Sequence, residues 1–60
     1  MEFMYKYEPE TGVYYECLVD RWSGREYERE PVTELYIRYI FGGDNNPNTE
    51  TIIDFIRRQR

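Results

Sequence analysis

Sixty residues have to fold here without the cross-links on which very short domains usually rely. A chain of this length buries only about 60% of the surface that its unfolded form exposes, and small scaffolds compensate with disulfides, a structural metal or a partner subunit. The sequence has one Cys and no His, so we expect no disulfide, no metal centre and no cofactor. Side chains alone must build the core of what we expect to be a single domain over residues 1–60.

Aromatic side chains are the main candidates to form this core and any contact surface. The chain contains seven Tyr, three Phe and one Trp, and Tyr and Trp bury large areas while keeping a polar group. Catalytic groups are scarce by comparison, because no imidazole is present to act as a general base near neutral pH. No phosphate-binding loop, nucleophile pair or paired-carboxylate motif stands out either. We therefore expect a binding protein and not an enzyme.

The charge balance restricts the class of partner. Twelve acidic residues oppose eight basic ones, which gives a net charge of -4. Such a chain repels a nucleic-acid backbone on average, so direct nucleic-acid binding is disfavoured. No apolar stretch approaches the roughly 20 residues that span a bilayer, and the N-terminal residues do not resemble a signal peptide. We expect a cytoplasmic protein with no membrane contact.

Three segments have the alternation of β-strands. They are Glu2–Tyr7, Val13–Trp22 and Arg25–Glu30, with a turn around Pro9 and Gly12, a two-residue hairpin turn at Ser23-Gly24, and Pro31 ending the third strand. In the second strand the face of Val13, Tyr15, Cys17 and Val19 is the more apolar one. That face is the better candidate for the core.

Two further segments fit both a helix and a strand. In Thr33–Phe41 the spacing favours a helix, with Thr33 as N-cap, Gly42 just past the C-terminus, and Glu34 four residues before Arg38. The segment Thr49–Arg60 is either an amphipathic helix or a buried strand, and in both cases it ends in a basic tail. The sequence thus predicts an α+β fold, in which a small antiparallel sheet of three to four strands packs against one or two short helices.

An acidic row is the most pronounced surface feature of the predicted sheet. Glu26, Glu28 and Glu30 alternate along the third strand and would share one face. Alternate residues lie about 6.6 Å apart along a strand, roughly twice the axial step of about 3.4 Å between phosphates on one DNA strand. The row could therefore imitate part of a phosphate backbone. The alternative is that these charges protect an exposed sheet edge from aggregation.

A second candidate surface lies on the first predicted helix. Leu35, Tyr36 and Tyr39 fall on one stripe, next to the acidic Glu34. This stripe could receive an apolar side chain of a partner or of a second copy of the chain. The alternative is that it packs onto the sheet as core.

Part of the chain resembles the short uracil-DNA glycosylase inhibitor of phi29-type phages. The similar segments are Gly12-Val13-Tyr14-Tyr15-Glu16, Thr33 to Tyr39, and Asn48-Thr49 leading to Ile52-Ile53-Asp54-Phe55. The resemblance implies a homodimer that occupies the DNA-binding cleft of the glycosylase, with an apolar cage for a protruding leucine. By position, Leu35 and Tyr39 would line that cage. The family has an acid at the position of Tyr36, so Glu34 or the Glu26 to Glu30 row would supply the charged contact.

Other segments are similar to the KTSC domain, a small module named after the C-terminal region of a lysyl-tRNA synthetase. They are Tyr7 to Gly12, Ser23 to Tyr27 and Pro31 to Tyr36, while the characteristic ending of that domain is absent. This resemblance implies a nucleic-acid-associated module in which Tyr and Arg stack on bases.

The leading hypothesis is a small acidic inhibitor from a phage or another mobile element. We expect it to bind a protein target with a basic nucleic-acid-binding cleft, as a partial DNA mimic, and to form a homodimer. The expected partner-binding residues are Glu26, Glu28, Glu30, Glu34, Leu35, Tyr36 and Tyr39.

Overall fold

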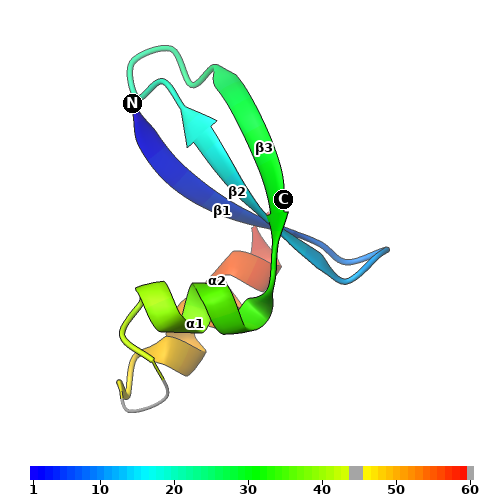
Figure 1. The fold of residues 1–60 in the computed structure, drawn as a ribbon, viewed down its shortest axis with the longest axis vertical. Coiled ribbons are helices and arrows are strands. Elements are labelled where there is room, and N and C mark those ends of the chain that lie inside the picture. Colours follow the sequence, from blue (N-terminus) through cyan, green and yellow to red (C-terminus); the bar gives the residue numbers. More distant parts are fainter. Residues whose placement is uncertain (44–45, 60) are drawn as a thin grey trace.

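Three strands followed by two helices make up the fold (Figure 1). The computed structural model describes residues 1–43 and 46–59. The elements are β1 (Glu2–Glu8), β2 (Val13–Val19), β3 (Glu26–Val32), α1 (Glu34–Ile40) and α2 (Thr49–Arg58). The sheet is antiparallel with strand order β1-β2-β3. The predicted α+β class is therefore confirmed, with three strands and two helices.

The two helices cover only part of the sheet. In Figure 1 they lie together below it, while the end that carries the N-terminus and the β2–β3 connection extends beyond them. The core joins Tyr14 of β2 to Ile37 of α1 and to Ile53 and Ile56 of α2. The helices thus cover one part of one sheet face, and the rest of that face is open.

The covered face is not the one that the apolar pattern of β2 predicted. Tyr14 lies under the helices, whereas the predicted core face of Val13, Tyr15, Cys17 and Val19 lies on the other side of the sheet. Cys17 and Val19 are buried all the same. Tyr14 can take the central position because its ring fills the core while its hydroxyl reaches polar partners at the edge.

Both ambiguous segments are helical, and their ends follow from local chemistry. The Thr33 hydroxyl accepts a hydrogen bond from the Tyr36 amide, which confirms the predicted N-cap of α1. At the other end, the Gly42 amide donates to Tyr39 and the Gly43 amide donates to Arg38. This is a Schellman motif, and Gly42 has the positive φ of 108° that such a position requires.

The last segment forms α2 up to Arg58, so the helical alternative for Thr49–Arg60 is correct and the strand alternative is wrong. Asn48 occupies the N-cap position without a side-chain hydrogen bond. Thr49 is buried instead and donates from its hydroxyl to the Gly43 carbonyl. Arg57 and Arg58 form the basic last turn, whereas Arg60 and part of the predicted polar loop, Asp44 and Asn45, lie outside the described residues.

The third strand departs from the sequence prediction in two places. Pro31 lies inside β3, opposite Tyr15, and does not end the strand. A proline is tolerated there because β3 is an edge strand that needs no donor on its outer side. The connection before β3 is also longer than two residues, since the Asp20 amide donates to the Arg25 carbonyl and the Gly24 amide donates to the Asp20 carbonyl.

Neither α1 nor α2 is long and apolar enough to cross a membrane, and no other helix occurs in the part of the chain that the structure describes.

Candidate protein-binding surface

A β-bulge in β3 divides the predicted acidic row. Glu28 lies opposite Leu18, but Glu26 lies opposite the next residue, Val19, so that Tyr27 is an extra residue in the strand. Residues directly opposite each other share a sheet face. Glu26 is therefore on the face of Val19, while Glu28 and Glu30 remain on the face of Leu18. The prediction that all three carboxylates share one face is wrong, because strict alternation cannot anticipate an inserted residue.

Glu26 is neutralised within the chain. Its carboxylate pairs with the Arg29 Nε at 2.7 Å and with the Lys6 Nζ at 3.2 Å. Residues three apart in a regular strand point to opposite faces, so the bulge is what allows the Glu26–Arg29 pair. The Arg29 guanidinium, followed by Lys6, lowers the pKa of Glu26 from 4.5 to about 2. Glu26 is thus a structural residue and not an exposed charge for a partner.

Cys17 lies on the same face as Glu26 and is fully buried. Burial raises the pKa of its thiol, and the charge of Glu26 raises it further. A buried thiol with a raised pKa is a poor nucleophile. Cys17 therefore serves as a small hydrophobic side chain, as the sequence suggested.

Glu28 and Glu30 make the uncovered part of the helix-bearing sheet face acidic, and they are joined there by Glu16. Glu16 lies directly opposite Glu30, and its carboxylate accepts hydrogen bonds from the hydroxyls of Tyr5 and Tyr36, each at 2.8 Å. Neither Glu28 nor Glu30 forms an ion pair with any cation in residues 1–43 or 46–59. The hydrogen bond to Glu16 raises the pKa of Tyr36, and the charge of Glu30 contributes as well.

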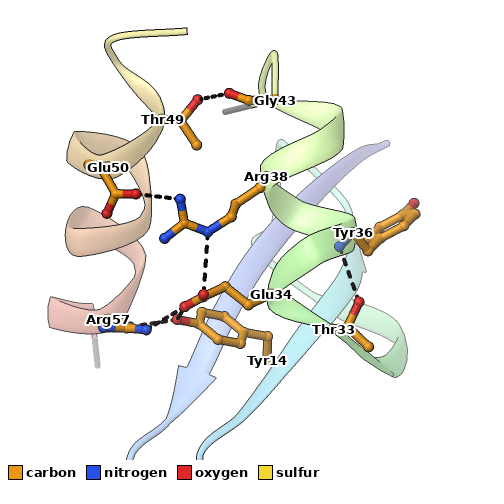
Figure 2. A network of polar contacts seen from close by, with 9 residues as sticks. All are labelled: Tyr14, Thr33, Glu34, Tyr36, Arg38, Gly43, Thr49, Glu50 and Arg57. Atoms are coloured by element: carbon orange, nitrogen blue, oxygen red, sulfur yellow. Dashed lines mark hydrogen bonds and ion pairs between the residues drawn. The ribbon is translucent and has the colours of Figure 1, made fainter. Parts of the chain in front are cut away.

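Glu34 makes its polar contacts with residues of its own chain. Figure 2 shows its carboxylate between Tyr14, Arg38 and Arg57, on the side of α1 that faces α2. The Tyr14 hydroxyl donates to Oε1 at 2.9 Å, and Arg57 pairs with the same oxygen. Arg38 pairs with Oε2 and also with Glu50 of α2. The predicted Glu34–Arg38 pair is confirmed, and Glu34 is a structural residue in this network.

The aromatic stripe of α1 faces solvent. Leu35 is 75% exposed, Tyr39 is 78% exposed and Tyr36 is 41% exposed, whereas the buried residue of α1 is Ile37. The Tyr36 ring projects from the side of α1 opposite the Glu34 network (Figure 2). The stripe does not pack as core and is free for contact. We call this stripe and the neighbouring open carboxylates the acidic-aromatic face, which consists of Glu16, Glu28, Glu30, Leu35, Tyr36 and Tyr39.

No family model, curated protein or solved structure matches this chain. The resemblances described above therefore remain hypotheses. Within residues 1–43 and 46–59, no three or more His, Cys, Asp or Glu side chains cluster in a way that could hold a metal ion.

Sequence reasoning did not include Glu16 among the expected partner-binding residues. The missing information was the strand register, which puts Glu16 opposite Glu30. Sequence reasoning also missed a basic hollow of about 990 Å³. Its walls include four cations, Lys6, Arg29, Arg57 and Arg58, together with Tyr7 and Tyr15. These residues are distant in sequence, so no local pattern reveals the hollow.

Proposed function

We propose that the chain is a stoichiometric inhibitor of a DNA-processing protein and that its acidic-aromatic face occupies a basic DNA-binding cleft. The proposed target is uracil-DNA glycosylase, in line with the resemblance to the phage inhibitor. The proposed place of action is the cytoplasm, that of the host cell if a phage encodes the chain.

The Glu16–Glu30 pair is the observation that carries this proposal. Two residues directly opposite in an antiparallel pair have Cβ atoms about 4.5–5.5 Å apart, and like charges there are destabilising. Glu28 adds a third carboxylate about 6.6 Å further along β3 on the same face. A cationic partner would relieve this repulsion on binding. Such a partner would also associate faster, and in a salt-dependent manner, because of electrostatic steering.

The apolar part of the face supplies the contact area that charge alone does not. Leu35 and Tyr39 are exposed side chains on the same stripe of α1, next to Tyr36, which is hydrogen-bonded to Glu16. Large apolar and aromatic side chains of this kind dominate the binding energy of many interfaces. The charged pattern would attract a basic cleft, and Leu35 and Tyr39 would then hold an apolar side chain of the target.

Inhibition of uracil excision tests the proposal. Nanomolar chain is expected to abolish excision by uracil-DNA glycosylase from a labelled oligonucleotide. In the Glu28→Gln/Glu30→Gln double variant, inhibition is expected to weaken by about tenfold or more, because the loss of two charge contacts corresponds to about 1.4 kcal/mol or more. Leu35→Ala is expected to weaken it similarly while the fold is retained.

The matched control is Glu10→Gln/Asp54→Asn, which removes two negative charges from exposed positions outside the acidic-aromatic face. This variant is expected to inhibit like the unmodified chain. Unchanged uracil excision at a large molar excess of chain would overturn the proposed function. Equal weakening by both double variants would show that net charge, and not this face, is responsible.

The basic hollow favours a second candidate function, the nucleic-acid-associated module implied by the KTSC resemblance. Arg29 lies over the ring of Tyr15 and Arg57 lies over the ring of Tyr7, each within 6 Å of the ring centre. Cations and aromatic rings in one hollow are the combination that binds single strands. Glu26 pairs with both Lys6 and Arg29, however, and Glu34 pairs with Arg57. These pairs leave less positive charge for phosphates, so this candidate ranks second.

A titration with a fluorescent single-stranded oligonucleotide at low salt distinguishes the two functions. For the inhibitor we expect no binding. For the module we expect binding that weakens steeply with salt and that is reduced in Arg58→Ala, whose guanidinium forms no ion pair with the described residues.

A further inference from the structure

The outer edge of β1 has no neighbouring strand among the described residues. The strand pairs with β2 over seven residues without a register shift and contains no proline. Its outer N–H and C=O groups therefore form an uninterrupted template for another strand. The opposite edge differs, because β3 is interrupted by the bulge and by Pro31. The open edge of β1 is the place where a further strand would add to the sheet.

We propose that β1 pairs in antiparallel fashion with β1 of a second copy of this chain, with Met4 opposite Met4. A two-fold axis through this position makes the contact self-complementary. Phe3 of each copy then lies opposite Tyr5 of the other, and Glu2 lies opposite Lys6. The two three-stranded sheets become one continuous sheet. This inference does not depend on which macromolecule the acidic-aromatic face binds.

The charged residues of β1 favour the register centred on Met4 over the register centred on Tyr5. Pairing centred on Tyr5 would place Glu2 opposite Glu8, and the symmetry would repeat this repulsion. Centring on Met4 replaces both repulsions with attractive contacts between Glu2 and Lys6. A shift of one residue in only one strand would turn the helices of the two copies to opposite faces of the joined sheet. The Met4-centred register places Glu2 opposite Lys6 and keeps the helices of both copies on the same face of the joined sheet.

In this register, the Phe3 side chain of the second copy would reach an apolar hollow on the first. Its volume is about 250 Å³, it adjoins Tyr5 on β1, and its other walls include Phe41, Ile52 and Phe55. Phe3 is 61% exposed and Phe55 is 60% exposed. Because Phe3 of the second copy lies opposite Tyr5 on the same face, its ring would enter this hollow. Gln59 at the rim is exposed and follows the end of α2, so its side chain can turn aside.

Sedimentation equilibrium tests the association. The unmodified chain is expected to be a dimer in the micromolar range. Phe3→Glu is expected to weaken dimerisation at least about a hundredfold, since each dimer loses two buried rings, while its circular dichroism spectrum stays unchanged. The control Trp22→Glu, at a residue that is 92% exposed in the β2–β3 connection, is expected to remain dimeric. A monomer throughout the micromolar range would overturn the proposal.

Disulfide formation tests the register. Both cross-linking variants carry Cys17→Ala, because the free thiol of Cys17 lies opposite Met4 on β2 and would compete for it. Met4→Cys then places two thiols at the two-fold axis, where the distance between opposite Cα atoms, about 4.5–5.5 Å, suits a disulfide. We expect rapid oxidation to a covalent dimer. Lys6→Cys on the same strand is the control and is expected to cross-link poorly, since the two copies of residue 6 lie about four residues apart along the pair, or about 13 Å. A dimer that cross-links equally through both positions, or that is insensitive to Phe3→Glu, would show that another surface is used.

Discussion

Ile37→Ala is expected to lower the free energy of unfolding by about 3 kcal/mol, within the range of about 2–5 kcal/mol for truncations of this kind. Ile37 has no exposed surface and joins α1 to Tyr14, Ile53 and Ile56 in the core. For a domain of this size, a loss of 3 kcal/mol corresponds to a fall in Tm of roughly 12–24 °C. Because the total stability expected for 60 residues is only about 3–9 kcal/mol, this loss would remove at least about a third of it. Thermal and urea denaturation measure the change.

Leu35→Ala is the matched control for this prediction, since it truncates an aliphatic residue in the same helix. Leu35 is 75% exposed, so we expect a change within about 0.5 kcal/mol. Similar losses in both variants would mean that α1 does not bury Ile37 selectively, and this would also remove the exposed stripe from the acidic-aromatic face.

Tyr14→Phe is expected to cost about 2 kcal/mol, although it removes only one oxygen atom. The Tyr14 hydroxyl donates to Glu34 and accepts from the Arg57 Nε, so it connects two charged groups at the edge of the core. Hydrogen bonds to charged groups contribute about 1.5–3 kcal/mol each, and Arg57 and Glu34 retain their direct contact in the variant. The neighbouring Tyr15→Phe is the control, because its hydroxyl makes no hydrogen bond to a described residue. We expect its stability to change by less than about 0.5 kcal/mol.

The cost of Tyr14→Phe should depend on pH. The Tyr14 hydroxyl is the largest cause that lowers the pKa of Glu34 below its ordinary 4.5, and Arg38 and Arg57 lower it further. A carboxyl group with a lowered pKa in the folded state contributes stability above its ordinary pKa and loses it as the pH falls through the folded-state pKa. The stability difference between the unmodified chain and Tyr14→Phe should therefore be full at neutral pH and narrow below pH 4.5. Urea denaturation at a series of pH values measures it, and a constant difference would show that the hydroxyl does not act through Glu34.

Much of the fold could be predicted from the sequence because its signals are local. Strand alternation located most of β1 and all of β2, although it extended the second strand to Trp22, and the Thr33 hydroxyl and Gly42 correctly marked the ends of α1. A cap or a positive φ depends on residues within one turn of the chain, which a single sequence contains.

The features that escaped prediction depend on how distant segments meet. The face of β2 that carries Tyr14 has polar groups, and its burial depends on Glu34 and Arg57 arriving from α1 and α2. The bulge at Tyr27 is a matter of register between β2 and β3, and it removes Glu26 from the acidic row. The sequence therefore predicted that the candidate surface is acidic and aromatic, but it did not predict all of its residues. Glu16 belongs to this surface, whereas Glu26 and Glu34 do not.

Pro31 and the bulge also determine how far this chain can grow by strand addition. After β1 pairs with β1 of a second copy, the free edge of each three-stranded sheet is β3. This edge is kinked at Tyr27 and lacks a backbone donor at Pro31. Further copies would find no regular ladder there, so the proposed assembly through β1 would close at two chains and would not continue into a fibre. The difference between its two sheet edges would thus limit self-association to a pair of chains, even at high protein concentration.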